Sequence, residues 1–92
     1  MNYFIEISPL AEEHIKFFKK SGQKILLNKI EKLINELEIH PFEGTGKPEA
    51  LKYENSGKWS RRIDQKHRLI YEVFENEILV EVISALGHYD EK

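Results

Sequence analysis

The sequence contains no cysteine, so disulfides, thiolate catalysis and cysteine-based zinc sites are all excluded. No apolar run approaches the ~20 residues that a membrane-spanning helix needs. The first residues, MNYFIEIS, lack the basic start and long apolar stretch of a signal peptide. These absences are consistent with a reducing cytoplasm, which is the location we expect for this chain.

Length and charge narrow the expectation further. The 92 residues suffice for one core, so we expect a single domain over 1–92, and 40% hydrophobic with 33% charged residues is a typical globular balance. Residues 1–41 carry six Lys and six acids (net 0), residues 42–68 seven Lys/Arg and four acids (+3), and residues 69–92 one Lys and six acids (−5), which sums to −2. The middle segment is therefore the candidate phosphate-binding region, although a surplus this small often marks only a solvated face.

The first half of the sequence predicts a strand and two helices. Residues 2–7 alternate between apolar and other side chains, as a short strand does. Ser8 is a suitable N-cap and Pro9 a suitable first residue for a helix that Gly22 ends. A second helix ends before Pro41, because the residue preceding proline leaves helical geometry. Its apolar stripe consists of Leu26, Ile30, Leu33, Ile34 and Leu37.

The second half predicts strands. Residues 42–50 contain two glycines and a proline, so we expect a loop without a regular element. Three strand-like runs follow, at 58–64, 67–74 and 78–86, and their short connections favour an antiparallel meander. The predicted fold class is α+β: strand-helix-helix and then a three-strand meander, with the helices packed on one side of a twisted sheet.

One segment carries a recognisable set of motifs. Residues 41–71 read PFEGTGKPEALKYENSGKWSRRIDQKHRLIY, and a His88-Tyr89 pair lies close to the end of the sequence. Together these motifs resemble the YoeB-type toxins of the RelE/ParE family, whose pattern joins a PFEG-x-GKPE loop, a WSRRI strand, an HRL strand and a terminal His-Tyr. The resemblance implies a RelE-like fold and a toxin of a type II toxin-antitoxin system that cleaves mRNA in the ribosomal A site.

The resemblance also implies a role for individual residues. Glu49 of the GKPE loop would be the general base, and Arg68 of the HRL strand would stabilise charge on the phosphate. His88 would be the general acid, and Tyr89 would help to orient the RNA. The basic residues expected to hold the RNA backbone are Lys47, Lys52 and Arg62. No metal and no cofactor is expected.

This residue set is chemically sufficient for metal-free RNA cleavage. Attack of a ribose 2′-hydroxyl on the neighbouring phosphate needs a base, an acid and positive charge for the extra charge on phosphorus. Each acid or base typically contributes ~10²–10⁴-fold. A histidine with an ordinary pKa near ~6.5 can hold the required proton near neutrality when phosphate or carboxylate neighbours favour it.

Considered one at a time, these residues have plainer explanations. A glutamate in a loop is usually solvated, a strand arginine usually lies on the surface, and a histidine near a terminus is often merely exposed. Trp59 is expected in the core. His14, His40 and His67 lack paired ligand spacing and are expected to be structural or exposed.

Two other functions stay open at this point: a ParE-like inhibitor of DNA gyrase that cuts nothing, and an antitoxin-bound co-repressor. The resemblance implies a cognate antitoxin of the YefM or Phd kind, the ribosome and mRNA as partners, and operator DNA bound only through the antitoxin complex. Whether the chain forms a homodimer stays open at this point. An acidic antitoxin strand is the expected occupant of the basic residues. The sequence departs from the family pattern in its extra residues 90–92 and its slightly acidic net charge.

Overall fold

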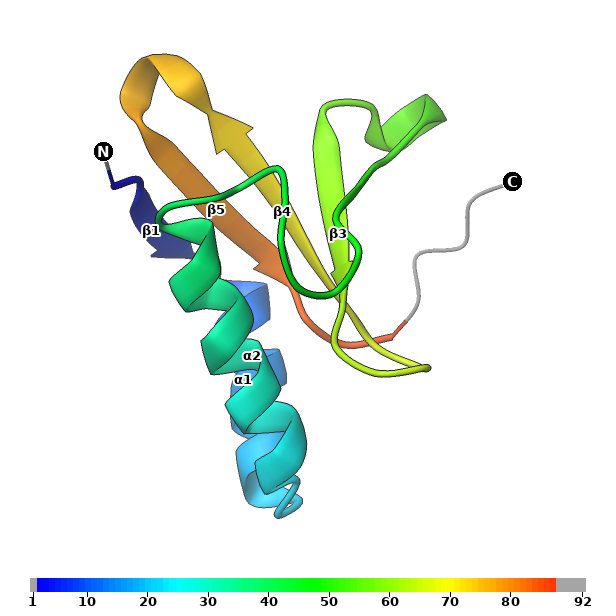
Figure 1. Cartoon of the computed structure of the whole chain (residues 1–92). Helices are drawn as coiled ribbons and strands as arrows, with labels where there is room; N and C mark the ends of the chain where they lie inside the picture. The colour runs from blue at the N-terminus through cyan, green and yellow to red at the C-terminus, as the bar shows by residue number, and fades with distance from the viewer. Residues whose placement is uncertain (1, 88–92) are drawn as a thin grey trace.

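The computed structural model describes residues 2–87 and has the predicted α+β architecture (Figure 1). Its elements in chain order are β1 (Phe4–Ile7), α1 (Pro9–Lys20), α2 (Lys24–Leu37), β2 (Glu49–Ala50), η1 (Tyr53–Asn55), β3 (Lys58–Arg62), β4 (Arg68–Phe74), η2 (Glu75–Glu77) and β5 (Leu79–Ser84). None of the helices among residues 2–87 is long and apolar enough to cross a membrane.

The strands form one mixed sheet in the order β1-β5-β4-β3-β2. The expected antiparallel meander of β3, β4 and β5 is confirmed, and β1 adds to β5 in parallel. One expectation was wrong in detail: the segment 42–50 was predicted to hold no regular element, but its last two residues form β2. They do so because Glu49 and Ala50 pair with Ser60 and Trp59 of β3, a partner that local sequence cannot reveal.

The predicted helix signals act as expected. The Ser8 hydroxyl accepts a hydrogen bond from the Ala11 amide at 3.1 Å and donates one to the Ile83 carbonyl at 2.7 Å, so the cap also ties α1 to β5. Gly22, with φ of +70°, makes the turn between the two helices. The core between helices and sheet consists of Ala11, Phe18, Ile30, Leu33, Leu37, Ile63, Leu69, Tyr71, Val80, Val82 and Ala85, with Trp59 packed against it as predicted.

A buried arginine joins the helices, the loop after α2 and the sheet. Arg61 on β3 is fully buried, and its Nη1 lies 3.0 Å from Oε1 of Glu36 on α2. Its Nε donates to the hydroxyl of Tyr71 at 3.2 Å, and its Nη2 donates to the carbonyls of His40 and Glu43. A buried guanidinium is tolerated only when its charge and donors are satisfied in this way.

Glu36 holds the loop as well as the arginine. The amide of Thr45 donates to Oε1 of Glu36 at 2.8 Å and its hydroxyl donates to Oε2 at 2.6 Å. Partial burial alone would raise the pKa of Glu36, but these hydrogen bonds and the charge of Arg61 outweigh it and lower that pKa. The loop crosses the same face of the sheet as the helices (Figure 1), and the Tyr71 hydroxyl donates to the Pro41 carbonyl at 2.7 Å.

Two glycines let this loop approach its partners. A Cβ at Gly44 would lie 2.5 Å from Oε1 of Glu36, and a Cβ at Gly46 would lie 2.8 Å from the backbone oxygen of Arg62. The carbonyl of Gly46 accepts from the Arg62 amide at 2.7 Å, so the loop runs directly against β3. This contact delivers the chain to Glu49 at the start of β2.

Replacing Glu36 with alanine should lower the free energy of unfolding by about 3 kcal/mol, because it leaves a buried guanidinium without its carboxylate. The stabilisation should be present above a pH of about 4.5, the ordinary glutamate value, and fade as the pH falls, since folding lowers the Glu36 pKa. Urea unfolding of Glu36→Ala beside Glu31→Ala, an exposed position on the same helix, tests this. Equal stabilities for the two variants would contradict it.

Gly46→Ala should cost more stability than Gly22→Ala. Both glycines have positive φ, which costs an alanine roughly 1–3 kcal/mol, but only Gly46 adds a clash with backbone. A Cβ at Gly22 meets nothing within 4 Å. Thermal unfolding measures the loss of stability in each variant, and the difference between the two losses is the cost of the clash at Gly46. Equal losses would show that the loop moves away from β3 without cost.

Candidate functional site

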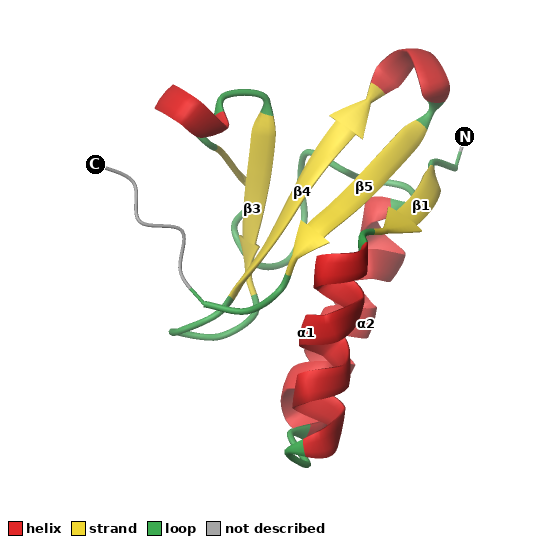
Figure 2. Cartoon of the chain, turned by 180° about the vertical axis from the view of Figure 1, so that it is seen from behind, coloured by secondary structure: helices red, strands yellow, loops and turns green. Residues whose placement is uncertain are grey.

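The predicted site residues of the sheet lie on the face away from the helices. Arg61 points toward α2, and successive strand residues alternate, so Ser60 and Arg62 point to the opposite face. Cross-strand partners share a face, which places Glu49, opposite Ser60, and Arg68, opposite Arg62, on that side too. Figure 2 views the sheet from this side, where neither α1 nor α2 crosses β3 or β4.

Register fixes how far apart these side chains begin. Glu49 and Arg62 are diagonal neighbours on adjacent strands, with a typical separation of roughly 7–8 Å. Arg68 is one strand further, which gives roughly 12 Å between its Cα and that of Glu49 from the standard strand spacing and rise. Extended side chains at these positions can meet the same phosphate from two sides. Glu49 and Arg62 are exposed and Arg68 is half-buried.

The two predicted lysines flank Glu49 in sequence. Lys47 is exposed and has φ of +50°, directly after the close contact between Gly46 and β3. Lys52 is also exposed and precedes η1. Glu49 therefore lies between two lysines in the chain and diagonal to Arg62 on β3.

His88 and Tyr89, the other two predicted catalytic residues, lie outside the described residues. The described chain reaches Gly87, whose carbonyl accepts from the Arg68 amide at 3.1 Å. The residue preceding His88 is therefore hydrogen-bonded directly to Arg68. The structure thus brings Glu49, Arg62 and Arg68 onto one face and leads the chain to the edge of that site.

The sequence analysis missed two residues of this region. Arg61 was not singled out, although it lies two residues from both Trp59 and Ile63. That spacing puts the three side chains on one face of a strand and so indicates that Arg61 faces the core. Ser60 lies between Glu49 and Ile70 in register and is only 1% exposed, yet its hydroxyl has no hydrogen-bond partner among the described residues. A buried hydroxyl without a partner is uncommon and calls for an explanation.

Within residues 2–87 no group of three or more potential ligands is placed to hold a metal ion. His40 is exposed, with its Nδ1 3.9 Å from Glu43. His14 and His67 are structural, and both accept hydrogen bonds from backbone amides of the segment after β5.

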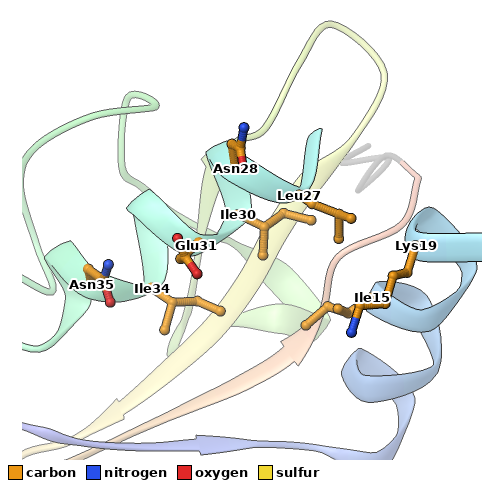
Figure 3. A pocket seen from close by; sticks show the side chains of 8 residues that line it. All are labelled: Ile15, Lys19, Leu27, Asn28, Ile30, Glu31, Ile34 and Asn35. Atoms are coloured by element: carbon orange, nitrogen blue, oxygen red, sulfur yellow. The ribbon is translucent and has the colours of Figure 1, made fainter. Parts of the chain in front are cut away.

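A groove of about 330 Å³ lies away from this site, between the two helices (Figure 3). Ile15, Ile30 and Ile34 contribute apolar side chains to it, and Lys19 and Glu31 lie at its rim. It contains no acid–base pair positioned for chemistry. The predicted site residues Glu49, Arg62 and Arg68 are instead on the face of the sheet away from the helices.

Comparison with known proteins identifies the family of this chain. Residues 8–89 match the family described as YoeB-like toxin of bacterial type II toxin-antitoxin system. Toxin YoeB of Mycobacterium bovis is 41% identical over 85 residues, covering 92% of this chain and 96% of that protein. Toxin YoeB of Escherichia coli is 49% identical over 57 residues, covering 62% of this chain and 68% of that protein.

Solved structures show the same fold. A YoeB/ParE toxin from Agrobacterium tumefaciens superposes with a TM-score of 0.87 at 34% identity, covering 94% of this chain and 99% of that one. The toxin in a YoeB-YefM complex from Staphylococcus aureus gives 0.81 at 36% identity, covering 97% and 100%. Family match, relatives and fold agree, and the chain belongs to the YoeB-like toxins of bacterial type II toxin-antitoxin systems.

Proposed function

We propose that this toxin is a ribosome-dependent endoribonuclease that cleaves mRNA in the ribosomal A site by metal-free acid–base catalysis. One observation carries the proposal: strand register puts a carboxylate, Glu49, and two arginines, Arg62 and Arg68, on one open face. Arg68 is also hydrogen-bonded to the residue that precedes His88. A single domain carries this set and would act in the cytoplasm, where messages are translated.

Each residue has a definite role in the proposed reaction. Glu49 takes the proton from a ribose 2′-hydroxyl, whose oxygen then attacks the adjacent phosphorus. Arg68 stabilises the added negative charge, and His88 gives a proton to the departing 5′-oxygen, with Tyr89 orienting the RNA. The bond to the 5′-oxygen breaks, which leaves a 2′,3′-cyclic phosphate and a 5′-hydroxyl end. Lys47, Lys52 and Arg62 hold neighbouring phosphates.

The small open site explains the proposed dependence on the ribosome. A flat sheet face with a few charged side chains can position one phosphodiester but has little surface for reading a base sequence. A message already held in the A site arrives with its backbone ordered, so the entropic cost of alignment is met elsewhere.

The same basic residues suit a cognate antitoxin. An acidic peptide laid across Lys47, Arg62 and Arg68 would pair with their charges and block the approach of RNA. Solved relatives from Staphylococcus aureus are described as a YoeB-YefM complex and a YoeB dimer, which supports a YefM-like antitoxin and a possible homodimer for this chain. Operator DNA would be reached through the antitoxin.

A ParE-like gyrase inhibitor and an antitoxin-bound co-repressor are the competing proposals. Neither needs a base and a phosphate-stabilising arginine on one open face. In both, alanine at His88 would leave toxicity or repression intact.

Glu49→Ala and His88→Ala should each lower the rate of message cleavage by about 10²–10⁴-fold, because each removes one proton-transfer partner. The measurement is the mapping of new RNA ends on ribosomes programmed with a defined message. Wild-type cuts should fall inside the A-site codon and end in a cyclic phosphate or its hydrolysed form.

Glu77→Ala is the matched control, because Glu77 is an exposed glutamate in the turn between β4 and β5, away from Arg68. It should cleave like the wild type. An intact message with wild-type toxin would contradict the proposed function and direct attention to gyrase.

Ser60→Ala tests whether the Ser60 hydroxyl contributes to stability or to RNA binding. Because its buried hydroxyl lacks a partner among the described residues, removing it should leave the free energy of unfolding unchanged or raise it by up to about 1 kcal/mol. If the hydroxyl binds the RNA between Glu49 and Arg68, cleavage should slow while stability holds. Loss of stability would show instead that the hydroxyl is bonded in solution.

A further inference from the structure

Two histidines hold the backbone of the segment that leads from β5 toward His88. The Ala85 amide donates to Nδ1 of His14 at 3.0 Å, and the Gly87 amide donates to Nδ1 of His67 at 2.8 Å. These amides belong to residues that have left the β5 strand, so the two rings replace strand partners that the segment has lost.

Both rings are themselves fixed by the fold. His14 is on α1, one turn after the helix start that Ser8 ties to the Ile83 carbonyl. His67 is 8% exposed and packs edge-on against the ring of Phe18, with 5.1 Å between ring centres. Its backbone amide donates to Oδ1 of Asp64 at 2.6 Å and its carbonyl accepts from the Ile63 amide at 2.9 Å.

The opposite side of the segment is anchored to the candidate site. The Gly87 carbonyl accepts from the Arg68 amide at 3.1 Å, while the Gly87 amide is held by the ring of His67, the residue before Arg68. One dipeptide, His67-Arg68, therefore grips both polar groups of Gly87. Gly87 has φ of +84°, a conformation that few other residues adopt.

We propose that His14 and His67 are positioning residues: their neutral rings accept the Ala85 and Gly87 amides and so fix residues 85–87, the backbone that leads from β5 to His88, beside Arg68. The inference rests on the proposed function for the role of His88. The hydrogen bonds themselves, however, are features of the folded toxin alone.

The chemistry requires a particular state of each ring. An Nδ1 atom that accepts a hydrogen bond carries no proton, so the proton of the neutral ring is on Nε2. A protonated ring would present an N–H to a backbone N–H, and the contact would become repulsive. Acid should therefore release Ala85 from His14.

The charged groups around the rings act in known directions. Burial lowers the pKa of His14, against the opposing effect of Glu13 on the same helix, so its neutral form persists to lower pH. Stability from this ring is thus present above a pH of about 6.5, the ordinary value, and is lost as the pH falls through the lowered pKa. His67 faces Asp64 and Lys66 of its turn, with Arg68 beside it in the chain and the uncharged Phe18 on α1.

The test uses paired substitutions in the whole toxin. Leucine at position 14 or 67 keeps bulk but removes the acceptor, whereas asparagine puts its Oδ1 near the place of Nδ1. In His67→Leu we expect cleavage on ribosomes to slow by roughly 10-fold or more, since small misplacements of a catalytic group are costly. His67→Asn should recover most of the rate. At position 14, His14→Leu should likewise cleave more slowly than His14→Asn. His40→Leu, at an exposed histidine, should cleave like the wild type.

Nuclear magnetic resonance tests the hydrogen bonds without any activity. In labelled wild-type toxin, nitrogen–nitrogen couplings should join Gly87 to His67 and Ala85 to His14. The coupling between Ala85 and His14 should disappear on acidification. In the leucine variants the released amide, Ala85 or Gly87, should exchange with solvent faster than in the wild type or the asparagine variants. Absent couplings, or leucine variants with unchanged amide exchange and unchanged cleavage, would overturn the inference. A wild type that shows the couplings but does not cut would instead refute only the proposed function.

Discussion

The structure depends on the burial of one guanidinium. Arg61 projects from β3 into the space between the sheet and α2, where Glu36 neutralises it and the carbonyls of His40 and Glu43 take up its donors. A charge in that position would be strongly destabilising without those partners. Because two of them belong to the loop after α2, satisfying the arginine also determines the path of the loop. A long connection without regular structure thereby acquires a single conformation.

That path decides where Glu49, the proposed base, lies. Once Thr45 is bonded to Glu36, the chain passes through Gly46 directly against Arg62 and enters β2 at Glu49. The two neighbouring arginines of β3 point to opposite faces of the sheet, because successive side chains of a strand alternate. Arg61 makes its hydrogen bonds in the interior, and Arg62 lies on the opposite face of the sheet with Glu49, the proposed base. The arginine that stabilises the fold and the arginine of the candidate site are therefore adjacent residues of one strand.

The chain that leads to His88, the proposed acid, is held by other elements. Whereas Glu49 is held through β3, the chain toward His88 is held through β4 and α1, by backbone hydrogen bonds to Arg68, His67 and His14. Segments far apart in the sequence thus meet at one end of the sheet. On an open face of this kind, the positions of the side chains depend on the backbone hydrogen bonds that hold their segments.

Periodicity and capping residues in the sequence determined both helices, the three-strand meander and the α+β class, because these depend on local propensity and on which side chains must leave water. The motif around Glu49 and Arg68 determined the family. Tertiary structure alone decided the parallel addition of β1, the two-residue strand β2, the burial of Arg61 and the use of His14 and His67 as acceptors. Each of these joins residues distant in sequence, and the partner that satisfies a charge or an amide is known only once the chain has folded around it.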